Sequence, residues 1–342
     1  MPIAPDATTA ALHATARELV ADRRGILAAD ESIATMSARL EKAGVTPTGT
    51  GRRDYRELLV TTPDLHEGVS GVILCDETLR QRLADGRPFP RALRDLGLLP
   101  GIKVDTGTTH LPGTAGELVT EGLDGLPARL AEYAELGARF AKWRAVIRIG
   151  EATPSPWALA ANAHALARYA SACQAAGIVP VVEPEVLMDG AHPLSRCASA
   201  TTDALTALFD ALRDARVDLR GTVLKPNMVV PGDGSPQRCP PAAVARATVD
   251  VLGAVLPDGL AGVAFLSGGQ APETATAHLA AMQEIDTPWP LTFSFGRALV
   301  SPALLEWRGA PDRVAAAQAT LARLVRRNAA VLRGSGAPLQ TA

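Results

Sequence analysis

Residues 140–186 read FAKWRAVIRIGEATPSPWALAANAHALARYASACQAAGIVPVVEPEV, and this stretch decides the fold class. It contains two apolar runs, Phe140–Ile149 and Ile178–Val186, which flank the Ala-rich segment Trp157–Ala176. The Ala-rich segment is amphipathic with a period of about 3.6 residues, and this pattern predicts a helix. A strand, a helix and a second strand in this order predict two parallel strands joined by a helical return.

The same alternation recurs on both sides of this unit. Six further apolar runs predict strands at Ile26–Asp30, Val69–Cys75, Gly101–Val104, Gly221–Met228, Leu260–Gly269 and Pro290–Gly296. Further helices are predicted at Thr201–Arg216, Ala242–Leu256 and Glu273–Glu284. Eight strands with helical returns predict a (β/α)8 TIM barrel, which we expect to form a single domain over residues 1–342. The ends, about residues 1–15 and 334–342, are predicted to be flexible.

Composition narrows the class of protein. Of the 342 residues, 47% are hydrophobic and 20% are charged, which is typical of a globular chain and not of a disordered one. The chain carries 34 basic and 36 acidic residues, and this balance argues against a nucleic-acid partner. No apolar run approaches the roughly 18 residues of a membrane span, and the N-terminus lacks the features of a secretory signal. We therefore expect a cytoplasmic protein without a membrane partner.

Sequence motifs for metals and nucleotide cofactors are missing. The four cysteines form no CxxC pair, and the six histidines are scattered without an HExxH motif. No GxxxxGK loop or complete GxGxxG fingerprint opens a helix; Gly49–Asp54 (GTGRRD) contains only a GxG fragment and is predicted to be a turn. We therefore expect no metal and no cofactor.

Polar residues end almost every predicted strand. Because the active site of a TIM barrel lies at the C-terminal ends of its strands, these residues are expected to meet at one mouth. They are Asp30, Lys103, Lys142, Arg144, Glu183, Glu185, Lys225, Ser267, Gly268, Gly269, Ser294, Gly296 and Arg297.

Lysines in apolar strands suggest a nucleophilic amine. Lys142 and Lys225 are costly to bury unless they are paired or neutral. If they face each other, repulsion and burial are expected to lower the pKa of one amine, which could then form a Schiff base with a carbonyl. The alternative interpretation is that each lysine is simply paired with a carboxylate.

Two carboxylates share one face of the strand that ends in Val186. Glu183 and Glu185 are two residues apart, so their side chains point the same way. One could act as an acid or base while the other forms an ion pair. Structural salt bridges to Lys142 and Arg144 remain an alternative that is compatible with catalysis. Asp30 could accept a hydroxyl proton, although its sequence context also suits a helix N-cap.

Glycines after the last two strands indicate an anion site. Ser267-Gly268-Gly269 and Ser294-Phe295-Gly296-Arg297 resemble the phosphate sites that barrels build after strands seven and eight. The alternative is a pair of tight turns. Lys103 and Arg39 could hold a second anionic end, so the predicted substrate is a phosphorylated carbonyl compound.

An ordered set of motifs resembles class I fructose-1,6-bisphosphate aldolase, the Schiff-base enzyme of glycolysis, from about Gly25 to Ala329. The motifs are GILAADES (25–32), GVILCDETL (71–79), DGRPFP (85–90), GIKVD (101–105), FAKWR (140–144), VEPEV (182–186), LKPNM (224–228), LSGGQ (266–270) and TFSFGRAL (292–299). The resemblance implies metal-independent, reversible cleavage of fructose 1,6-bisphosphate to dihydroxyacetone phosphate and glyceraldehyde 3-phosphate. It also implies a homotetramer.

The resemblance assigns a role to each matching position. It implies that Lys225 forms the Schiff base and that Glu183 is the acid/base, with Glu185 and Lys142 as partners and Asp30 acting on the C4 hydroxyl proton. Arg144 matches an active-site arginine. Ser267, Gly268, Gly269, Gly296 and Arg297 match the phosphate site; Ser294 matches a neighbouring serine, and Lys103 the lysine at the second phosphate.

Three positions depart from the animal members of the family. Thr35 keeps a hydroxyl and Arg39 keeps an arginine at the second phosphate end, but Ala38 replaces a lysine. Phe295 replaces a tyrosine, and the tail, which ends at Ala342, has no aromatic residue where those members have a terminal tyrosine. These departures leave the preference between bisphosphate and monophosphate substrates open.

Three other functions compete with this prediction. They are a Schiff-base aldolase for a related ketose phosphate, a zinc-dependent aldolase, and a non-catalytic phosphosugar-binding protein. The scattered histidines disfavour zinc, and the combination of Lys225, Glu183 and Lys142 with Asp30 disfavours a mere binding protein.

Overall fold

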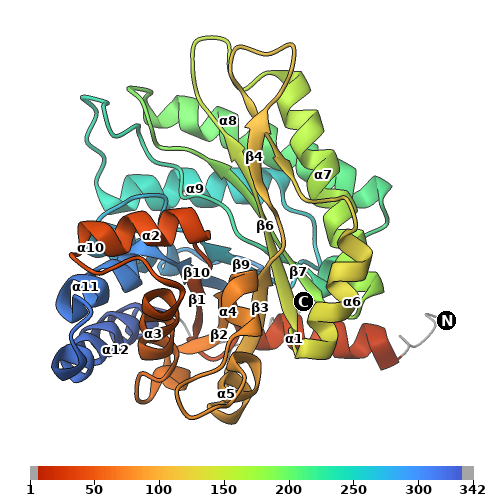
Figure 1. The fold of residues 1–342 in the computed structure, drawn as a ribbon. Coiled ribbons are helices and arrows are strands. Elements are labelled where there is room, and N and C mark those ends of the chain that lie inside the picture. The colour runs from red at the N-terminus through yellow and green to blue at the C-terminus, as the bar shows by residue number, and fades with distance from the viewer. Residues whose placement is uncertain (1–6, 333–342) are drawn as a thin grey trace.

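The computed structural model describes residues 7–332, and its centre is a closed barrel of parallel strands (Figure 1). Around the barrel the strands follow the order β1-β10-β9-β8-β7-β6-β3-β2. They are β1 (Gly25–Ala29), β2 (Val69–Leu74), β3 (Leu99–Lys103), β6 (Phe140–Ile147), β7 (Val179–Val186), β8 (Val223–Leu224), β9 (Gly262–Phe265) and β10 (Leu291–Phe295). Each predicted run supplies one strand, so the predicted TIM barrel is confirmed.

Helices surround the barrel and cover the apolar outer faces of its strands (Figure 1). The predicted helix Trp157–Ala176 corresponds to α7, and the other three predicted helices correspond to α8, α9 and α10. The helices are α1 (Ala7–Val20), α2 (Ile33–Lys42), α3 (Gly49–Val60), α4 (Asp76–Arg80), α5 (Phe89–Asp95), α6 (Leu126–Leu136), α7 (Pro156–Ala175), α8 (Leu194–Asp214), α9 (Pro241–Val255), α10 (Pro272–Gln283), α11 (Arg297–Trp307) and α12 (Val314–Ala330).

The half of the barrel interior at the N-terminal ends of the strands, called the lower barrel below, is apolar and is closed by α1. Leu12 and Leu19 of α1 belong to the same buried cluster as Ile26, Val181 and Phe140 of the strands. Phe140 fills the barrel so completely that a Cβ on Gly101 would lie 2.2 Å from its ring. This packing leaves the opposite, C-terminal end of the barrel for polar side chains.

Three segments differ from their predictions. Residues 7–15 were expected to be flexible but lie in α1, because Leu12 finds a partner surface under the barrel that composition alone does not reveal. The rest of the two predicted flexible ends, residues 1–6 and 334–342, lies outside the described residues. Gly49–Asp54 was predicted to be a turn but begins α3, where the Thr48 hydroxyl accepts a hydrogen bond of 2.9 Å from the Gly51 amide.

A hairpin that was not predicted follows β3. It consists of β4 (Gly107–His110) and β5 (Leu118–Glu121), which pair antiparallel outside the barrel. In Figure 1 it extends away from the barrel beside the long strand β6. Its first residues reach the C-terminal mouth of the barrel, where Gly107 and Thr108 line the cavity described below.

Across residues 7–332, no helix combines the length and the apolar character that crossing a bilayer requires.

Candidate active site

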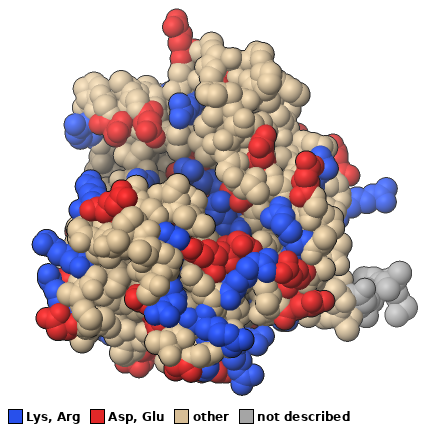
Figure 2. All heavy atoms as spheres, in the orientation of Figure 1, with Lys and Arg blue, Asp and Glu red and all other residues tan. Residues whose placement is uncertain are grey.

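A cavity of 480 Å³ opens at the C-terminal ends of the barrel strands. Basic and acidic side chains meet in this recessed region near the middle of Figure 2. All of the predicted site residues except Gly269 line the cavity: Asp30, Thr35, Arg39, Lys103, Lys142, Arg144, Glu183, Glu185, Lys225, Ser267, Gly268, Ser294, Gly296 and Arg297. Residues from seven separate segments of the sequence therefore converge on one site.

Strand alternation explains how charged residues enter the barrel. Along β6, Phe140 packs in the apolar lower interior, and Lys142 and Arg144 follow on the same face nearer the mouth. Along β7, Val181 is likewise apolar, and Glu183 and Glu185 follow it. Each strand thus supports the core with its first inward residues and the site with its last.

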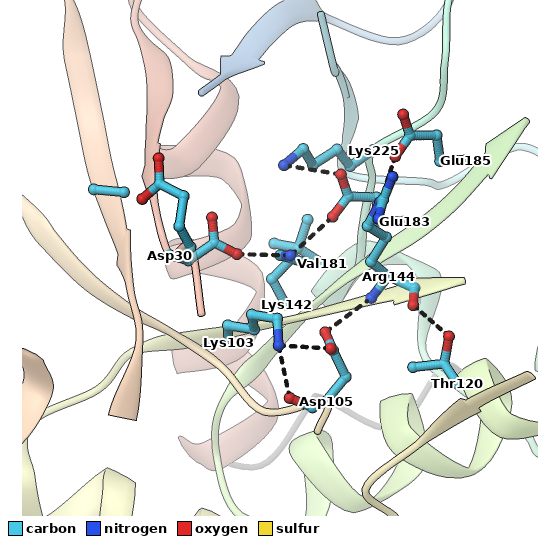
Figure 3. Close-up of polar contacts among 12 residues, drawn as sticks. Asp30, Lys103, Asp105, Thr120, Lys142, Arg144, Val181, Glu183, Glu185 and Lys225 are labelled. Carbon is cyan, nitrogen blue, oxygen red and sulfur yellow. Dashed lines mark hydrogen bonds and ion pairs between the residues drawn. The ribbon is translucent and has the colours of Figure 1, made fainter. Parts of the chain in front are cut away.

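A network of ion pairs connects the central lysines and carboxylates (Figure 3). The Lys142 ammonium lies 2.7 Å from Asp30 Oδ2 and 3.2 Å from Glu183 Oε2. The other carboxylate oxygen of Glu183 lies 3.1 Å from Lys225 Nζ. Lys142, Glu183 and Lys225 are all buried, so solvent screens these interactions little. Glu183 is the shared partner of both lysines.

The pKa shifts of Asp30, Glu183 and Lys142 favour their charged forms. Burial would raise the pKa of Asp30, but Lys142 and Lys225 lower it from 3.8 to about 2. Burial likewise opposes ionisation of Glu183, and the same two lysines hold its pKa below the usual value. Burial would lower the pKa of Lys142, but Asp30 and Glu183 raise it above the usual range. The lowered pKa that was expected for one of the two amines is therefore not found at Lys142, because two carboxylates outweigh the neighbouring ammonium.

Arg144 and Glu185 form a second pair beside this network. The Arg144 guanidinium donates to Glu185 Oε2, and the Thr120 hydroxyl donates to the Arg144 carbonyl at 2.7 Å. Burial opposes the charge of Arg144, but Glu185 raises the pKa of the guanidinium above its usual value. The salt bridges of Glu183 to Lys142 and of Glu185 to Arg144 thus exist alongside the contact between Glu183 and Lys225, and the catalytic interpretation stays a prediction.

One side of the cavity has the features of an anion site. Helix α11 begins at Arg297, directly after Gly296, and its N-terminal end faces the cavity. Gly268 and Gly269 have φ angles of 55° and 93°, a left-handed conformation that favours glycine. A Cβ on Gly269 would lie 3.3 Å from Arg297 Nη2, so Gly269 makes room for the arginine and does not itself line the cavity.

The Ser294 hydroxyl belongs to the same side. It is buried on β10 and has no hydrogen-bond partner within residues 7–332. An unsatisfied buried hydroxyl that lines a cavity is available to a bound molecule.

The opposite side holds the cations predicted for a second anionic group. Thr35 and Arg39 come from α2, and Lys103 ends β3. Arg39 Nη1 lies 2.5 Å from Glu31 Oε1, and Lys103 Nζ lies 2.7 Å from Asp105 Oδ1. Each of these two cations therefore already has a carboxylate partner.

Comparison with known proteins shows which family the chain belongs to. The sequence model of the family described as fructose-bisphosphate aldolase class-I matches residues 11–338. The chain belongs to the class-I fructose-bisphosphate aldolase family. The resemblance deduced from the ordered motifs is thereby confirmed.

Individual class-I aldolases match over most of their length. The chain is 52% identical over 297 residues to the probable fructose-bisphosphate aldolase class 1 of Xanthomonas campestris, covering 86% of this chain and 89% of that protein. It is 50% identical over 308 residues to cytosolic fructose-bisphosphate aldolase 5 of Arabidopsis thaliana, covering 90% and 86%. Among solved structures, fructose-bisphosphate aldolase from Plasmodium falciparum, in complex with TRAP and a small-molecule inhibitor, matches with a TM-score of 0.94 at 42% identity, covering 96% and 95%.

Two acidic residues of this class-I aldolase were missed by the sequence analysis. Glu31 and Asp105 both line the cavity, and both lie inside motifs that were quoted for the resemblance. Alternation of side chains along the strand could have identified Asp105, because Gly101, Lys103 and Asp105 fall on the same face of β3 and its continuation. No comparable signal marked Glu31, whose side chain is directed by tertiary contacts.

Proposed function

We propose that the protein is a metal-independent class I fructose-bisphosphate aldolase (EC 4.1.2.13) that needs no cofactor. The reaction is the reversible cleavage of fructose 1,6-bisphosphate to dihydroxyacetone phosphate and glyceraldehyde 3-phosphate in glycolysis and gluconeogenesis. The observation that carries the proposal is Lys225, buried 3.1 Å from a carboxylate that also contacts Lys142. Family membership supports the reaction. The family resemblance implies the residue roles below, and the contacts of Lys225, Glu183 and Asp30 support them.

The first step is Schiff-base formation at Lys225. Among residues 7–332, Lys142 forms ion pairs with both Asp30 and Glu183, whereas Lys225 pairs only with Glu183, so Lys142 is the more firmly held cation. Glu183, which is ionised at rest, can take a proton from the Lys225 ammonium and release the amine. The amine attacks the C2 keto carbon, and Glu183 returns a proton to the carbinolamine oxygen so that water leaves as the imine forms.

Carbon–carbon cleavage follows from the protonated imine. Asp30, whose low pKa keeps it ionised, takes the proton of the C4 hydroxyl. The C3–C4 bond then breaks, its electron pair moves toward the imine nitrogen, and the aldehyde product leaves. Protonation of the resulting enamine and hydrolysis of the imine restore the Lys225 amine.

The order of the strands around the barrel supports an assignment of the two phosphate ends. The groups after β9 and β10 lie near β8, which precedes Lys225, because these strands are neighbours in the barrel. Carbon 1 is bonded to the reacting C2, so its phosphate fits Ser267, Gly268, Gly296 and Arg297. The C6 phosphate then falls on the side of Lys103, Arg39 and Thr35.

The same proposal includes a cytoplasmic location and a homotetramer. Relatives named as cytosolic enzymes support the location, and the family resemblance supports the tetramer. Sedimentation equilibrium would contradict the tetramer if it gave the mass of a single chain.

Reductive trapping tests the proposed mechanism. Incubation with dihydroxyacetone phosphate and a chelator, followed by borohydride, should attach the triose to Lys225, as peptide mapping would show. Lys225→Met should abolish the adduct, whereas Lys103→Met, which also changes a lysine of the cavity, should retain it. A folded protein that binds the triose phosphate but forms no adduct would contradict the Schiff-base mechanism and favour a phosphosugar-binding protein.

A further inference from the structure

The cations of the cavity are unequally neutralised. Six lysines and arginines and five carboxylates line it. Five of these cations contact a carboxylate: Arg39, Lys103, Lys142, Arg144 and Lys225. Arg297 forms no ion pair in the described part of the chain. The C1 phosphate therefore meets an uncompensated guanidinium, whereas the C6 phosphate meets cations that are already paired.

Glu31 is fixed beside Arg39 by a buried arginine. Arg56 of α3 is 1% exposed and donates to the Glu31 carbonyl at 2.9 Å and to the Ala29 carbonyl at 3.0 Å. Its Nη2 also lies 3.3 Å from Glu31 Oε2, while Glu31 Oε1 lies 2.5 Å from Arg39. A carboxylate held on both oxygens cannot easily turn away when an anion approaches.

Asp105 holds Lys103 in a similar way. The Lys103 ammonium contacts the Asp105 carboxylate at 2.7 Å and its carbonyl at 2.8 Å. The second carboxylate oxygen of Asp105 accepts from the Arg144 amide at 3.3 Å, which ties the residue to β6. Asp105 is buried, so its negative charge acts through a medium of low dielectric constant.

We propose that Glu31 and Asp105 are specificity-determining residues that weaken recognition of the C6 phosphate. A phosphate dianion on this side must share Arg39 and Lys103 with two fixed carboxylates and is repelled by both. Part of the binding energy of the second phosphate is lost, so the enzyme discriminates only modestly between ketose bisphosphates and ketose 1-phosphates. This inference rests on the proposed aldolase function.

Neutralising Glu31 tests the inference. Glu31→Gln keeps the size of the side chain and removes its charge. The ratio of kcat/KM for fructose 1,6-bisphosphate to kcat/KM for fructose 1-phosphate should rise about three- to tenfold, mainly through a lower KM for the bisphosphate. Asp105→Asn should raise the same ratio through Lys103, which keeps the test valid if one variant fails to fold.

A double-mutant cycle separates the charge effect from other changes. In an Arg39→Ala background, Glu31→Gln should have little effect on the ratio, because the cation that Glu31 neutralises is gone. Glu132→Gln is the matched control: it removes a glutamate that pairs with Arg80 on the surface, outside the cavity, and should leave the ratio unchanged.

The outcomes distinguish this inference from the proposed function. Absence of cleavage of both substrates and of any triose adduct on Lys225 in the unmodified protein would overturn the proposed function itself. An active enzyme whose ratio is unchanged in folded Glu31→Gln and Asp105→Asn variants would overturn only the inference. An equal rise with and without Arg39 would also overturn it, because the effect would not depend on the paired cation.

Discussion

Lys142 illustrates how much a single residue depends on its neighbours. It is a buried lysine, and burial alone would favour its neutral form. Asp30 and Glu183 reverse this preference because they lie close to the ammonium in a region that solvent screens weakly. Lys142 in turn keeps both carboxylates ionised, which is the state that the proposed proton transfers require. In the proposed mechanism, Lys142 therefore sets the charge of the groups that act on substrate.

The ion pair of Asp30 should make stability depend on pH. The pKa of Asp30 is lowered from 3.8 to about 2 in the folded protein, so the folded state favours the ionised form. This stabilisation is present above pH 3.8 and is lost as the pH falls toward 2. We expect Asp30→Asn to lower the free energy of unfolding at pH 7 by about 2 kcal/mol, as measured by urea denaturation.

The difference between the two proteins should shrink as the pH falls below about 4. Asp210→Asn provides a control, because Asp210 forms an exposed pair with Arg213 and should change stability by about 0.5 kcal/mol or less. If the gap between wild type and Asp30→Asn stayed constant down to the lowest pH at which the protein is folded, the pKa assigned to Asp30 would be wrong.

At the residue level, the sequence located charged side chains that the structure brings together in one cavity. Lys225, Glu183 and Asp30 were found because a charged residue at the end of an apolar run is conspicuous. Glu31 was missed because Glu in a loop is ordinary, and its side chain is fixed by contacts with Arg39 and with Arg56, which lies 25 positions along the chain. The raised pKa of Lys142 was not foreseen, because the sequence does not show that Asp30 lies beside it.

At the scale of elements, β6 and β7 each combine a core segment with a catalytic segment. The first inward residues of both strands are apolar and contact α1 or the lower barrel, and the following inward residues carry charge. The core therefore supports the site directly, since both belong to the same two extended segments. The short strand β8 is different, because Lys225 follows it immediately and is held by a hydrogen bond of 2.8 Å from its own amide to the Val182 carbonyl.

Removing the ring of Phe140 tests how much the apolar packing of the lower barrel contributes to the stability of the fold. Phe140 is fully buried and occupies space beside Gly101. Phe140→Ala should lower the free energy of unfolding by about 3–5 kcal/mol, because a large cavity forms in a rigid barrel. Chemical denaturation measures the effect, with Leu136→Ala on the exposed side of α6 as a control of similar chemistry. A loss as small as that of the control would show that Phe140 does not fill the barrel.

Element prediction was most accurate for the strands and weakest for the helices that follow β1. All eight strands of the barrel were located, since their apolar runs are buried on both faces. Helix α3 was taken for a turn at its start because GTGRRD contains two glycines, and the cap by Thr48 was not recognised. The β4–β5 hairpin was missed because its residues are exposed or half-buried, with Thr120 as the one buried residue, and follow no strong alternation.

At the scale of the whole molecule, the overall charge and the charge of the cavity have opposite signs. The chain has a formal net charge of -2, whereas the cavity is lined by six cations and five carboxylates. An anionic substrate is therefore attracted by the local field of the mouth and not by the protein as a whole. The range of this attraction is short at physiological ionic strength, about 8 Å.

Salt should weaken the binding of fructose 1,6-bisphosphate, which carries two phosphates, more strongly than the binding of fructose 1-phosphate. Raising the ionic strength from roughly 0.05 M to 0.5 M shortens the screening length severalfold. We expect KM to rise for both substrates, and more for fructose 1,6-bisphosphate than for fructose 1-phosphate, because the former carries more charge. Steady-state kinetics at fixed pH measure the two values, and an equal rise for both would contradict this expectation.

The sequence by itself determined the fold class, the family and the identity of the central catalytic candidates. Apolar runs separated by amphipathic segments are local patterns, and the ordered motifs place one chemically distinctive residue after each run. Only the tertiary structure decided which charges meet: Lys142 with Asp30, Arg39 with Glu31, and Lys103 with Asp105. The physical reason is that an ion pair depends on distance in space, and barrel closure brings together residues that the sequence separates.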